Sequence, residues 1–419
     1  MSNWSEVTLG DLCSRVTVGH VGKMADEYVE DGVPFLRSQN VRPFVIEPSG
    51  MLQVSESFHQ KLRKSTLRAG DVVVVRTGYP GTAAVIPDHL DGSNCADLVV
   101  ITPSESVNGH LLAAVFNSVW GKSAVGSQLV GSAQQHFNVG SAKALRVRLP
   151  ERHVQDKIAA VLCALNDLIE NNRRRVEVLE EMARAIYREW FVHFRYPGHE
   201  DATLVDSPLG PIPEQWSVKC VADLSSAVTR GIAPKYAEDG SWVVINQKCI
   251  RDERVSLSVA RRQERAVPET KRVQSGDVLI NSTGVGTLGR VALYRGGLQN
   301  LTVDSHVTIV RPQDTSLNPW YGLSLVSKKP EFEQLSSGST GQTELGRTDV
   351  GALRVVLPSP DTRMKFADCA WPLLSQADEL LRWNLALAKL RDLLLPKLVT
   401  GQIDVSSLDL DGLVEGSVA

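Results

Sequence analysis

The chain has 419 residues, more than one hydrophobic core usually supports, so we expect two or more domains. Its 45 Lys and Arg against 48 Asp and Glu give a formal net charge of −3, which excludes recognition of nucleic acid through overall positive charge. No run of eighteen apolar residues and no basic-then-apolar N-terminus is present, so we predict a cytoplasmic protein with no membrane partner.

Residues 1–150 carry short apolar runs separated by turn signals. DVVVVRTG (71–78) ends at Thr-Gly and LVVITP (98–103) ends at proline, while GHLLAAVFNSV (109–119) has helical spacing. This pattern predicts an α/β (α+β) domain dominated by a twisted, partly antiparallel sheet.

Residues 151–196 predict a long helix. Ile158, Leu165, Asn172, Leu179 and Ile186 recur every seven residues, and Val161, Leu168, Arg175 and Met182 lie three further on. A flanking row widens this stripe on one side, as expected of a helix that packs against a partner helix, and consists of Leu162, Ile169, Val176, Ala183 and Trp190. This spacing is a heptad seam, and the run from Gln155 to Phe191 would extend roughly 55 Å. Asn172 would either fix the register of the seam or turn to solvent.

The second half repeats the first. WSEVTLGDL (4–12) returns as WSVKCVADL (216–224), and ALRVRLP (144–150) returns as ALRVVLP (352–358). Residues 197–358 therefore predict a linker and a second domain of the same kind, with DVLINSTG (277–284), HVTIVRP (306–312) and a helix near 319–327 in the equivalent places. The unit is a domain followed by a long helix, present twice as a pseudo-twofold repeat.

A second helical region is predicted over 359–402, followed by a flexible tail over 403–419. Its seam positions are Phe366, Leu373, Leu380, Leu387 and Leu394, which correspond to the seam of the first helix. We expect the two helices to pair antiparallel as a coiled-coil-like element. Pro372 falls inside the second pattern and should start that helix or kink it.

No enzyme signature fits the chain. Gly121-Lys122-Ser123 lacks the upstream glycine of a phosphate-binding loop, because Phe116 stands at that position. No Asn-Pro-Pro-Tyr methyl-transfer motif is present, His136, His193 and His306 lack matching ligands, and the six cysteines are scattered without zinc-site or disulfide spacing. We therefore expect no catalytic residue, no metal and no cofactor.

Loop-located amides, hydroxyls and cations recur in both halves beside glycines. Arginine can bond guanine, and Asn or Gln can bond adenine, through two parallel hydrogen bonds in the major groove. The candidates for DNA contact are Arg37, Gln39, Asn40, Arg76, Thr77, Gln134, Gln135, His136, Asn246, Gln247, Lys248, Ser282, Thr283, His306, Gln342, Thr343 and Arg347. Capping turns are the alternative interpretation of these clusters.

Basic residues also gather locally, either as solvated faces or as phosphate contacts. The clusters are Lys61, Arg63, Lys64 and Arg68 in the first half, and Arg251, Arg254, Arg261, Arg262, Arg265, Lys271 and Arg272 in the second.

Several segments together resemble one family. SPLGPIPEQW (207–216), RAIYREWFVHF (184–194) and LRDLLLPKLVTGQI (390–403), with PFLRSQNV (34–41) and STGQTELGRTDVGAL (339–353), resemble the DNA sequence-specificity subunit of type I restriction-modification systems. The resemblance spans essentially the whole chain.

This resemblance implies two target recognition domains separated by two helical spacers. Each domain would recognise one half of a bipartite, asymmetric double-stranded DNA target. The helices would set the spacing and dock two methyltransferase (modification) subunits, which use S-adenosylmethionine, and restriction/translocase subunits would complete the complex. The specificity subunit itself would be non-catalytic.

Two other functions remain open at this stage. One is a stand-alone DNA-modifying enzyme, which would turn over DNA without partner subunits. The other is a coiled-coil protein-interaction scaffold without DNA binding, which would form no sequence-preferring complex with DNA.

Overall fold

The structure is a computed structural model that describes residues 4–24, 26–129, 136–335, 344–410 and 412. It divides into two compact units, each described here by itself. The first unit contains Met1–Arg173 and Arg382–Ala419, and the second contains Arg174–Leu381. Each unit therefore combines one sheet-containing domain with half of each long helix.

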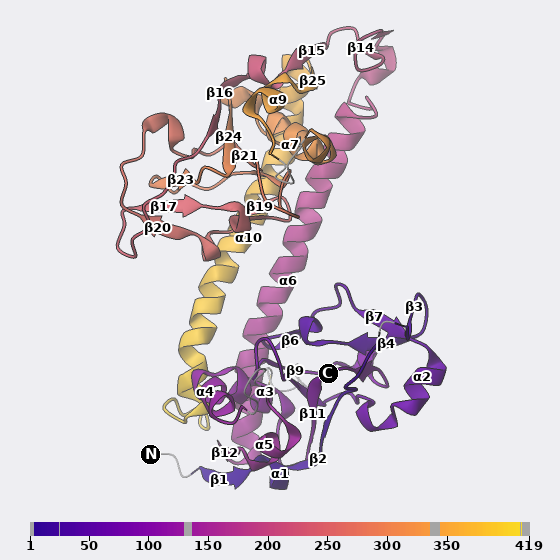
Figure 1. Ribbon diagram of the computed structural model, residues 1–419, viewed down its shortest axis with the longest axis vertical. Helices are drawn as coiled ribbons and strands as arrows, with labels where there is room; N and C mark the ends of the chain where they lie inside the picture. Colours follow the sequence, from indigo (N-terminus) through magenta and orange to yellow (C-terminus); the bar gives the residue numbers. More distant parts are fainter. Residues whose placement is uncertain (1–3, 25, 130–135, 336–343, 411, 413–419) are drawn as a thin grey trace. The chain divides into compact units, whose positions relative to one another are not determined.

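The first unit is built on a four-stranded antiparallel sheet of order β2-β11-β8-β9 (Figure 1). These strands are β2 (Cys13–Val18), β11 (Leu98–Pro103), β8 (Val72–Val75) and β9 (Ala83–Val85). Every side chain of β8 is buried, because α3 (Gly109–Asn117) covers one face and a second apolar cluster covers the other. Valine suits such a strand since its branched side chain packs well on a pleated surface.

A second sheet in this unit has the order β10-β4-β7-β3, in which β10 runs parallel to β4. Its strands are β3 (Tyr28–Val29), β4 (Val33–Leu36), β7 (Leu52–Val54) and β10 (Asn94–Cys95). The remaining strands form two antiparallel pairs, β1 (Ser5–Thr8) with β12 (Arg146–Leu149) and β5 (Val41–Arg42) with β6 (Val45–Ile46). The other helices are α1 (Leu9–Leu12), η1 (Ser38–Asn40), α2 (Glu56–Lys61), η2 (Arg63–Ser65), η3 (Asp88–Leu90), α4 (Val119–Ser127) and α5 (Val139–Ala144).

The second unit repeats this topology. Its four-stranded antiparallel sheet has the order β16-β24-β21-β22, and its second sheet has the order β20-β17-β23 with β17 parallel to β23. The strands are β16 (Ser225–Arg230), β24 (Val307–Pro312), β21 (Val278–Asn281), β22 (Val291–Leu293), β20 (Arg261–Gln263), β17 (Trp242–Ile245) and β23 (Leu301–Val303). The four-stranded antiparallel sheets have the same strand order, and β23-β17-β20 matches β10-β4-β7 without a counterpart of β3 as a strand. This agreement confirms the predicted fold class and internal repeat.

Smaller elements complete the second unit. Three antiparallel pairs are β13 (Leu204–Val205) with β14 (Ile212–Pro213), β15 (Ser217–Cys220) with β25 (Arg354–Leu357), and β18 (Ile250–Arg251) with β19 (Arg254–Val255). The helices are η4 (His199–Asp201), η5 (Val221–Leu224), η6 (Gln247–Cys249), η7 (Leu257–Val259), η8 (Glu269–Lys271), η9 (Thr315–Leu317), α7 (Trp320–Ser327), α8 (Lys329–Gln334) and α9 (Arg347–Ala352).

The long helices are α6 (Arg152–Phe191) and α10 (Pro360–Val399), each of 40 residues (Figure 1). In the first unit the start of α6 packs with the end of α10, since Ile158 and Leu398 share a core cluster. In the second unit the end of α6 packs with the start of α10, and the ring centroids of Phe191 and Phe366 are 4.9 Å apart. The predicted antiparallel pairing is confirmed.

Pro372 does not start the second helix, because α10 already begins at Pro360. The proline lacks the N–H that would bond the carbonyl four residues earlier, so it removes one hydrogen bond from the helix. Phe366, Ala370 and Leu374 around it are all buried, and this packing stabilises the helix across that position.

The buried stripe of α6 includes the predicted flanking row but leaves out most of the second row of the seam. Leu162, Val176 and Ala183 are buried, whereas Leu168 and Met182 of the second predicted row are exposed. Among the first-row positions, Ile158, Asn172, Phe366 and Leu380 are buried, and Leu165, Leu179, Ile186, Leu373, Leu387 and Leu394 are half-buried. The reason is that a straight helix with 3.6 residues per turn drifts against a strict seven-residue repeat.

The segment after Gly401 is held over its first residues, in contrast to the expected flexible tail. Val405 is buried in the core of the first unit. The Lys157 ammonium of α6 donates to the carbonyl oxygens of Ser406 and Leu408 at 2.9 and 2.7 Å. Within the described parts of the chain, no helix has both the length and the hydrophobicity that a membrane crossing requires.

Candidate nucleic-acid interface and helix contacts

Equivalent short turns follow β4 and β17, and an asparagine caps each of them. In the first unit, Asn40 is fully buried, and its amide donates to the carbonyl oxygens of Glu47 and Ser49. In the second unit, Asn246 Oδ1 accepts from the Lys248 backbone N–H at 2.9 Å. The capping interpretation holds for these two side chains, and it leaves Gln39 and Lys248 exposed on the turns.

Arg37 and Gln39, on the same turn as Asn40, each use part of their hydrogen-bonding capacity within the protein. The Arg37 guanidinium lies 5.9 Å from the Tyr28 ring centroid and donates to Gly50 O at 2.9 Å. Gln39 Nε2 donates weakly to the same oxygen at 3.4 Å. Both retain further donors for a ligand.

Three predicted residues of the second unit meet at one edge of its sheets. Gln247 Nε2 donates to Thr283 Oγ1 at 2.6 Å, and Thr283 Oγ1 lies 2.9 Å from His306 Nδ1. Gln247 follows β17, Thr283 follows β21 and His306 precedes β24, and the antiparallel pairing of β21 with β24 brings these ends together. We call Gln247, Thr283 and His306 the polar triplet.

Buried groups support the polar triplet from below. Ser282 is fully buried, and its hydroxyl lies 2.6 Å from Thr308 Oγ1, so it positions Thr283 rather than facing solvent. Asp304 Oδ1 accepts from the His306 backbone N–H at 2.9 Å. Burial raises the pKa of Asp304, although this hydrogen bond and the nearby His306 oppose the rise.

The equivalent edge of the first unit carries an ion pair instead. Arg76 Nη1 donates to Asp97 Oδ1 at 2.8 Å, and Thr77 Oγ1 donates to Asp97 Oδ2 at 2.9 Å. Arg76 Nε also donates to Phe137 O at 3.0 Å, so its guanidinium is largely occupied by the protein. His136, half-buried, lies beside Phe137 in the sequence.

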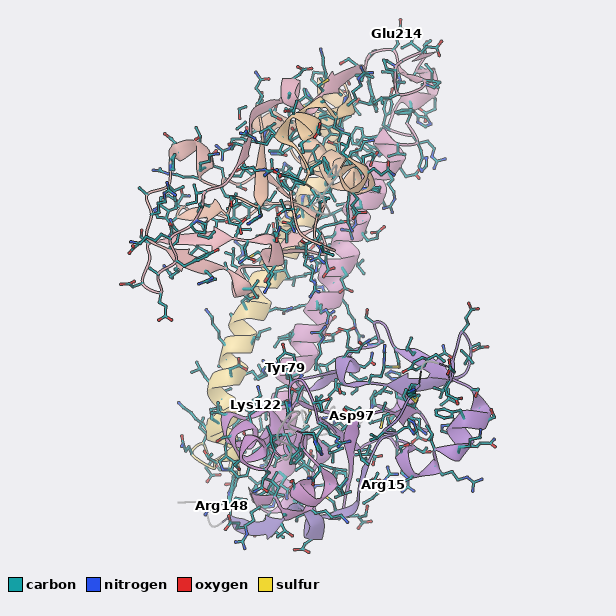
Figure 2. All side chains as sticks on the ribbon, viewed as in Figure 1. Arg15, Tyr79, Asp97, Lys122, Arg148 and Glu214 are labelled. Carbon is teal, nitrogen blue, oxygen red and sulfur yellow. The ribbon has the colours of Figure 1, made fainter. Side chains whose placement is uncertain are left out.

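Two exposed loop tips were missed by the sequence interpretation. Tyr79, labelled in Figure 2, is 84% exposed, and Val285 at the equivalent place is fully exposed. Each follows a glycine with positive φ, Gly78 and Gly284, which lets the chain turn sharply there. The repeated Thr-Gly pair was the available signal, because it marks a loop tip beside the candidate residues.

Cations gather near the start of α9. Arg347 is exposed, and the Lys271 ammonium donates to Thr229 Oγ1 and to the Arg230 carbonyl oxygen. Burial lowers the pKa of Lys271, and the positive charge of Arg347 lowers it further. Gln134, Gln135, Gln342 and Thr343 lie outside the described residues.

Several arginines of the second predicted basic cluster bind within the protein. The Arg261 guanidinium lies 3.7 Å from the Tyr236 ring centroid. Arg262 donates to Gly240 O at 3.0 Å, and Arg265 donates to Ala233 O at 3.2 Å. This use of the side chains reduces the part of the cluster that could contact phosphate.

Asn172 lies inside the helix pair rather than facing solvent. It is 2% exposed, and its amide donates to Asn384 Oδ1 at 3.0 Å. Asn384 Nδ2 in turn donates to Ile169 O at 3.0 Å. Of the two sequence interpretations, the buried one is correct, and such a polar pair favours one register of the two helices.

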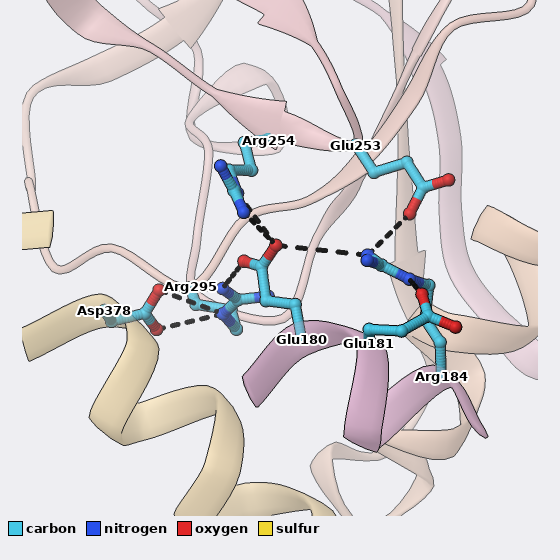
Figure 3. Close-up of polar contacts among 7 residues, drawn as sticks. All are labelled: Glu180, Glu181, Arg184, Glu253, Arg254, Arg295 and Asp378. Atoms are coloured by element: carbon cyan, nitrogen blue, oxygen red, sulfur yellow. Dashed lines mark hydrogen bonds and ion pairs between the residues drawn. The ribbon is translucent and has the colours of Figure 1, made fainter. Parts of the chain in front are cut away.

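A buried ion cluster joins the second domain to both helices (Figure 3). Glu180 of α6 accepts from Arg254 of β19 at 2.7 Å and from Arg295 at 3.0 Å. Arg295 also binds both carboxylate oxygens of Asp378 on α10. Burial works against the charged form of Arg295, but Asp378 and Glu180 outweigh it and raise the pKa of the guanidinium.

The corresponding hairpin of the first unit also contacts the helices. Glu47, next to β6, pairs with Arg173 of α6 at 3.0 Å. Phe44, in the β5–β6 turn, lies with its ring centroid 5.1 Å from the Arg391 guanidinium of α10. In each unit, a short hairpin therefore fixes the domain on the helix pair.

Both helices carry apolar side chains on their outer faces. In the first unit these are Leu168 on α6 and Trp383, Leu385, Leu390 and Leu393 on α10. Of the four on α10, Trp383, Leu390 and Leu393 follow a spacing of seven and three. In the second unit they are Val178, Met182 and Met364. Exposed apolar rows of this kind mark surfaces for protein contact.

No group of three or more His, Cys, Asp or Glu that could hold a metal ion occurs among the residues that the structure describes.

Comparison with known proteins adds relatives over the full length. The chain is 20% identical to the type I restriction enzyme HindI specificity subunit of Haemophilus influenzae, over 96% of this chain and 100% of that protein. This chain is similar to the specificity subunits of type I restriction enzymes. The resemblance drawn from the sequence is thereby confirmed.

A second specificity subunit, MjaIX of Methanocaldococcus jannaschii, is 24% identical over 66% of this chain. The alignment spans 65% of the MjaIX subunit, and that with the putative MjaX specificity subunit spans 44% of that protein. No family model matches the chain.

A solved structure shows that the fold is that of a specificity subunit. The type I restriction-modification S subunit from M. genitalium superposes with a TM-score of 0.60 at 14% identity, over 94% of this chain and 96% of that one. This likeness confirms the combination of two similar domains and two long helices.

Proposed function

We propose that this chain is the non-catalytic, cytoplasmic DNA-recognition subunit of a type I restriction-modification complex. Residues 1–150 and 197–358 each bind one half of a bipartite, asymmetric double-stranded DNA target. The helical regions 151–196 and 359–402 set the spacing between the halves. One observation carries the proposal, which is that the same domain topology occurs twice with different polar side chains at equivalent sheet edges.

The different edges predict different half-sites. The second domain offers the polar triplet with Lys248 and Arg347, which combines amide, hydroxyl, imidazole and cationic groups. The first domain offers Arg37, Gln39, Thr77 and His136 beside an occupied Arg76. Since amide and guanidinium groups prefer different base edges, the two domains would select different sequences.

The outer faces of the helices support docking of two modification subunits. The helix pair buries one apolar stripe of each helix in itself, and the exposed rows on α6 and α10 remain for partner helices. The modification subunits would supply S-adenosylmethionine and the methyl transfer, and restriction/translocase subunits would join the assembly. The chain itself needs no cofactor for recognition.

The proposal is tested by gel-shift titration of the complex with its modification subunits at two stated salt concentrations. Gln247→Ala should weaken binding of the preferred sequence by about 1 to 3 kcal/mol and relax the preference at one base pair. Gln299→Ala, an exposed glutamine of the same domain, is the matched control and should bind as the wild type does.

Two results would contradict the proposal. Absence of any sequence-preferring complex would favour a protein-interaction scaffold. Methyl transfer or cleavage by the purified chain without partner subunits would favour a stand-alone enzyme.

A further inference from the structure

A cavity of about 410 Å³ opens in the first unit, where β1 and β12 meet α3, α4 and the end of α10. Its apolar wall consists of Trp4, Val115, Trp120 and Val399. Its polar rim consists of Glu6, Arg148 and Thr400. This volume lies in the range of sites that bind a small molecule or a large side chain, about 300 to 1,000 Å³.

The repeat shows what fills the equivalent place in the second unit. Trp216, which corresponds to Trp4, is 5% exposed there, whereas Trp4 is only half-buried. The Trp216 ring lies 5.7 Å from Phe191, 5.5 Å from Phe194 and 5.0 Å from Tyr196. Aromatic side chains at the end of α6 and directly after it therefore cover this tryptophan from within the chain.

The segment after α10 does not supply such side chains. The spacing that aligns Ile186 with Leu394 aligns Phe194 with Gln402 and Tyr196 with Asp404. Both Gln402 and Asp404 are exposed polar residues. The segment after α10, which has no Phe, Tyr or Trp in its sequence, therefore gives Trp4 no counterpart of Phe194 and Tyr196.

The strand pair beside the tryptophan is also more apolar in the second unit than in the first. In the second unit, Val218 of β15 lies opposite Val356 of β25, and both pack against the core. In the first unit, Glu6 of β1 lies opposite Arg148 of β12, and both line the cavity. The two tryptophans can stack with an aromatic ring, and the charged rim can bond polar groups next to that ring. This combination suits an aromatic side chain of a binding partner better than one that is always buried within the chain.

The cavity also continues the outer apolar row of α10. Trp383, Leu390 and Leu393 are exposed, and a further step of seven leads to Thr400 on the rim, directly after the end of α10. At about 1.5 Å per residue, this row extends roughly 25 Å and ends at the cavity. A partner helix that packs along the row would end at the opening.

We propose that the cavity binds a Phe or Tyr side chain at the end of a partner helix docked on α10. That side chain supplies from the partner what Phe194 and Tyr196 supply to Trp216 within the chain. The proposal rests on the proposed function in that the partner helix belongs to a modification subunit.

The first experiment probes the cavity directly, with the full chain labelled with 5-fluorotryptophan. The probe is a blocked peptide that copies residues 192–198, VHFRYPG. We expect saturable shifts of the ¹⁹F signals of Trp4 and Trp120, assigned by Trp4→Phe and Trp120→Phe, and no shifts with a peptide that has alanine at both aromatic positions. Unchanged Trp4 and Trp120 signals, or equal shifts with the alanine peptide, would overturn the proposal.

The second experiment blocks the cavity in the complex. Thr400→Trp places an aromatic ring at the rim, and Arg148→Glu reverses a rim charge, while Lys122→Glu changes an exposed lysine of α4 outside the lining (Figure 2). We expect the first two variants to weaken binding of the modification subunit about tenfold and the control to leave it unchanged. An unaltered thermal midpoint for Thr400→Trp shows that the variant is folded.

A third variant separates this proposal from the proposed function. Leu390→Asp should abolish docking on the outer row. If Leu390→Asp disrupts assembly while Thr400→Trp and Arg148→Glu do not, the cavity proposal fails and helix docking stands. If none of the three variants affects assembly, helix docking on α10 fails as well.

A truncated chain that ends at residue 412 tests whether residues 413–419 occupy the cavity themselves. Tighter binding of the peptide to the truncated chain than to the full chain would show such competition, and it would overturn the assignment of the cavity to a partner.

Discussion

Replacing Glu180 by alanine should loosen the β18–β19 hairpin of the second domain from the helix pair. The Glu180 side chain is 5% exposed and accepts a hydrogen bond from Arg254 Nε at 2.8 Å, with Arg254 Nη2 at 2.7 Å, and another from Arg295 Nη2 at 3.0 Å. Its removal leaves two guanidinium groups without their shared carboxylate (Figure 3). Breaking a buried ion pair by removing one partner typically costs about 3 to 5 kcal/mol.

The structure favours the lower end of that range. Arg295 keeps its hydrogen bonds to both carboxylate oxygens of Asp378, and Arg254 is 27% exposed and can recruit water. We therefore expect Glu180→Ala to lower the opening free energy of the β18–β19 hairpin by about 3 kcal/mol. Hydrogen exchange of the backbone amides in residues 250–255 of the full chain measures this quantity locally, without assuming that both units unfold together.

The adjacent Glu181 provides a matched control. It also forms two ion pairs, with Arg184 at 3.0 Å and Arg188 at 2.5 Å, but its side chain is 54% exposed. Exposed pairs contribute about 0 to 1 kcal/mol, so Glu181→Ala should leave the exchange of the hairpin nearly unchanged. Equal effects of the two substitutions, or a loss below about 1 kcal/mol for Glu180→Ala, would refute the assignment of Glu180 as the anchor.

Three further predictions concern the helices, the DNA contacts and pH. Asn172→Leu should lower the free energy of unfolding in urea by about 1 to 2 kcal/mol, because it leaves the side-chain carbonyl oxygen of Asn384 without its donor. The double variant Asn172→Leu/Asn384→Leu should recover that loss. An unchanged stability of the single variant would contradict the buried pair. Lys248→Ala should weaken DNA binding equally for all sequences and reduce the salt slope by about 1, whereas a sequence-selective loss would make Lys248 a base contact. Burial raises the pKa of Glu47, but the hydrogen bonds from Ser49 and Arg173 outweigh it and lower that pKa, so the ionised carboxylate stabilises the fold above its unfolded pKa of 4.5. This contribution is lost as the pH falls through the lower folded value. Glu47→Gln should therefore reduce the loss of stability at acidic pH, and an unchanged pH profile would show that Glu47 does not contribute to it.

The fold could be predicted because its signals are repeated along the chain. Two repeated signals predicted the domain pattern, namely the Thr-Gly turns after β8 and β21 and the Trp-Ser pair at the start of each domain. The apolar periodicity predicted the helices. The inner and outer rows of α6 were not separable, since Leu162 and Leu168 are equally apolar in the sequence. Only packing against α10 decides that Leu162 is buried and Leu168 is exposed.

The polar contacts were harder to predict because their partners lie far apart in the sequence. Glu180 stands in a highly charged run, where a glutamate normally faces solvent, and its partners Arg254 and Arg295 come from two distant hairpins. Conversely, Asn40 has the chemistry of a base-contacting side chain, but its amide caps its own turn. Residue type indicated what each group can bind, and the folded chain determines which partner it has.

The most direct test of the account is to map adenine methylation in a host that expresses this chain with its modification subunits, before and after exchange of the second domain's sheet-edge residues. Gln247, Thr283 and His306 would be replaced together by residues from another specificity subunit. The account predicts a bipartite motif in which only one half changes, at constant spacing. A continuous motif, no motif, or a change in both halves would contradict the assignment of one half-site to each domain.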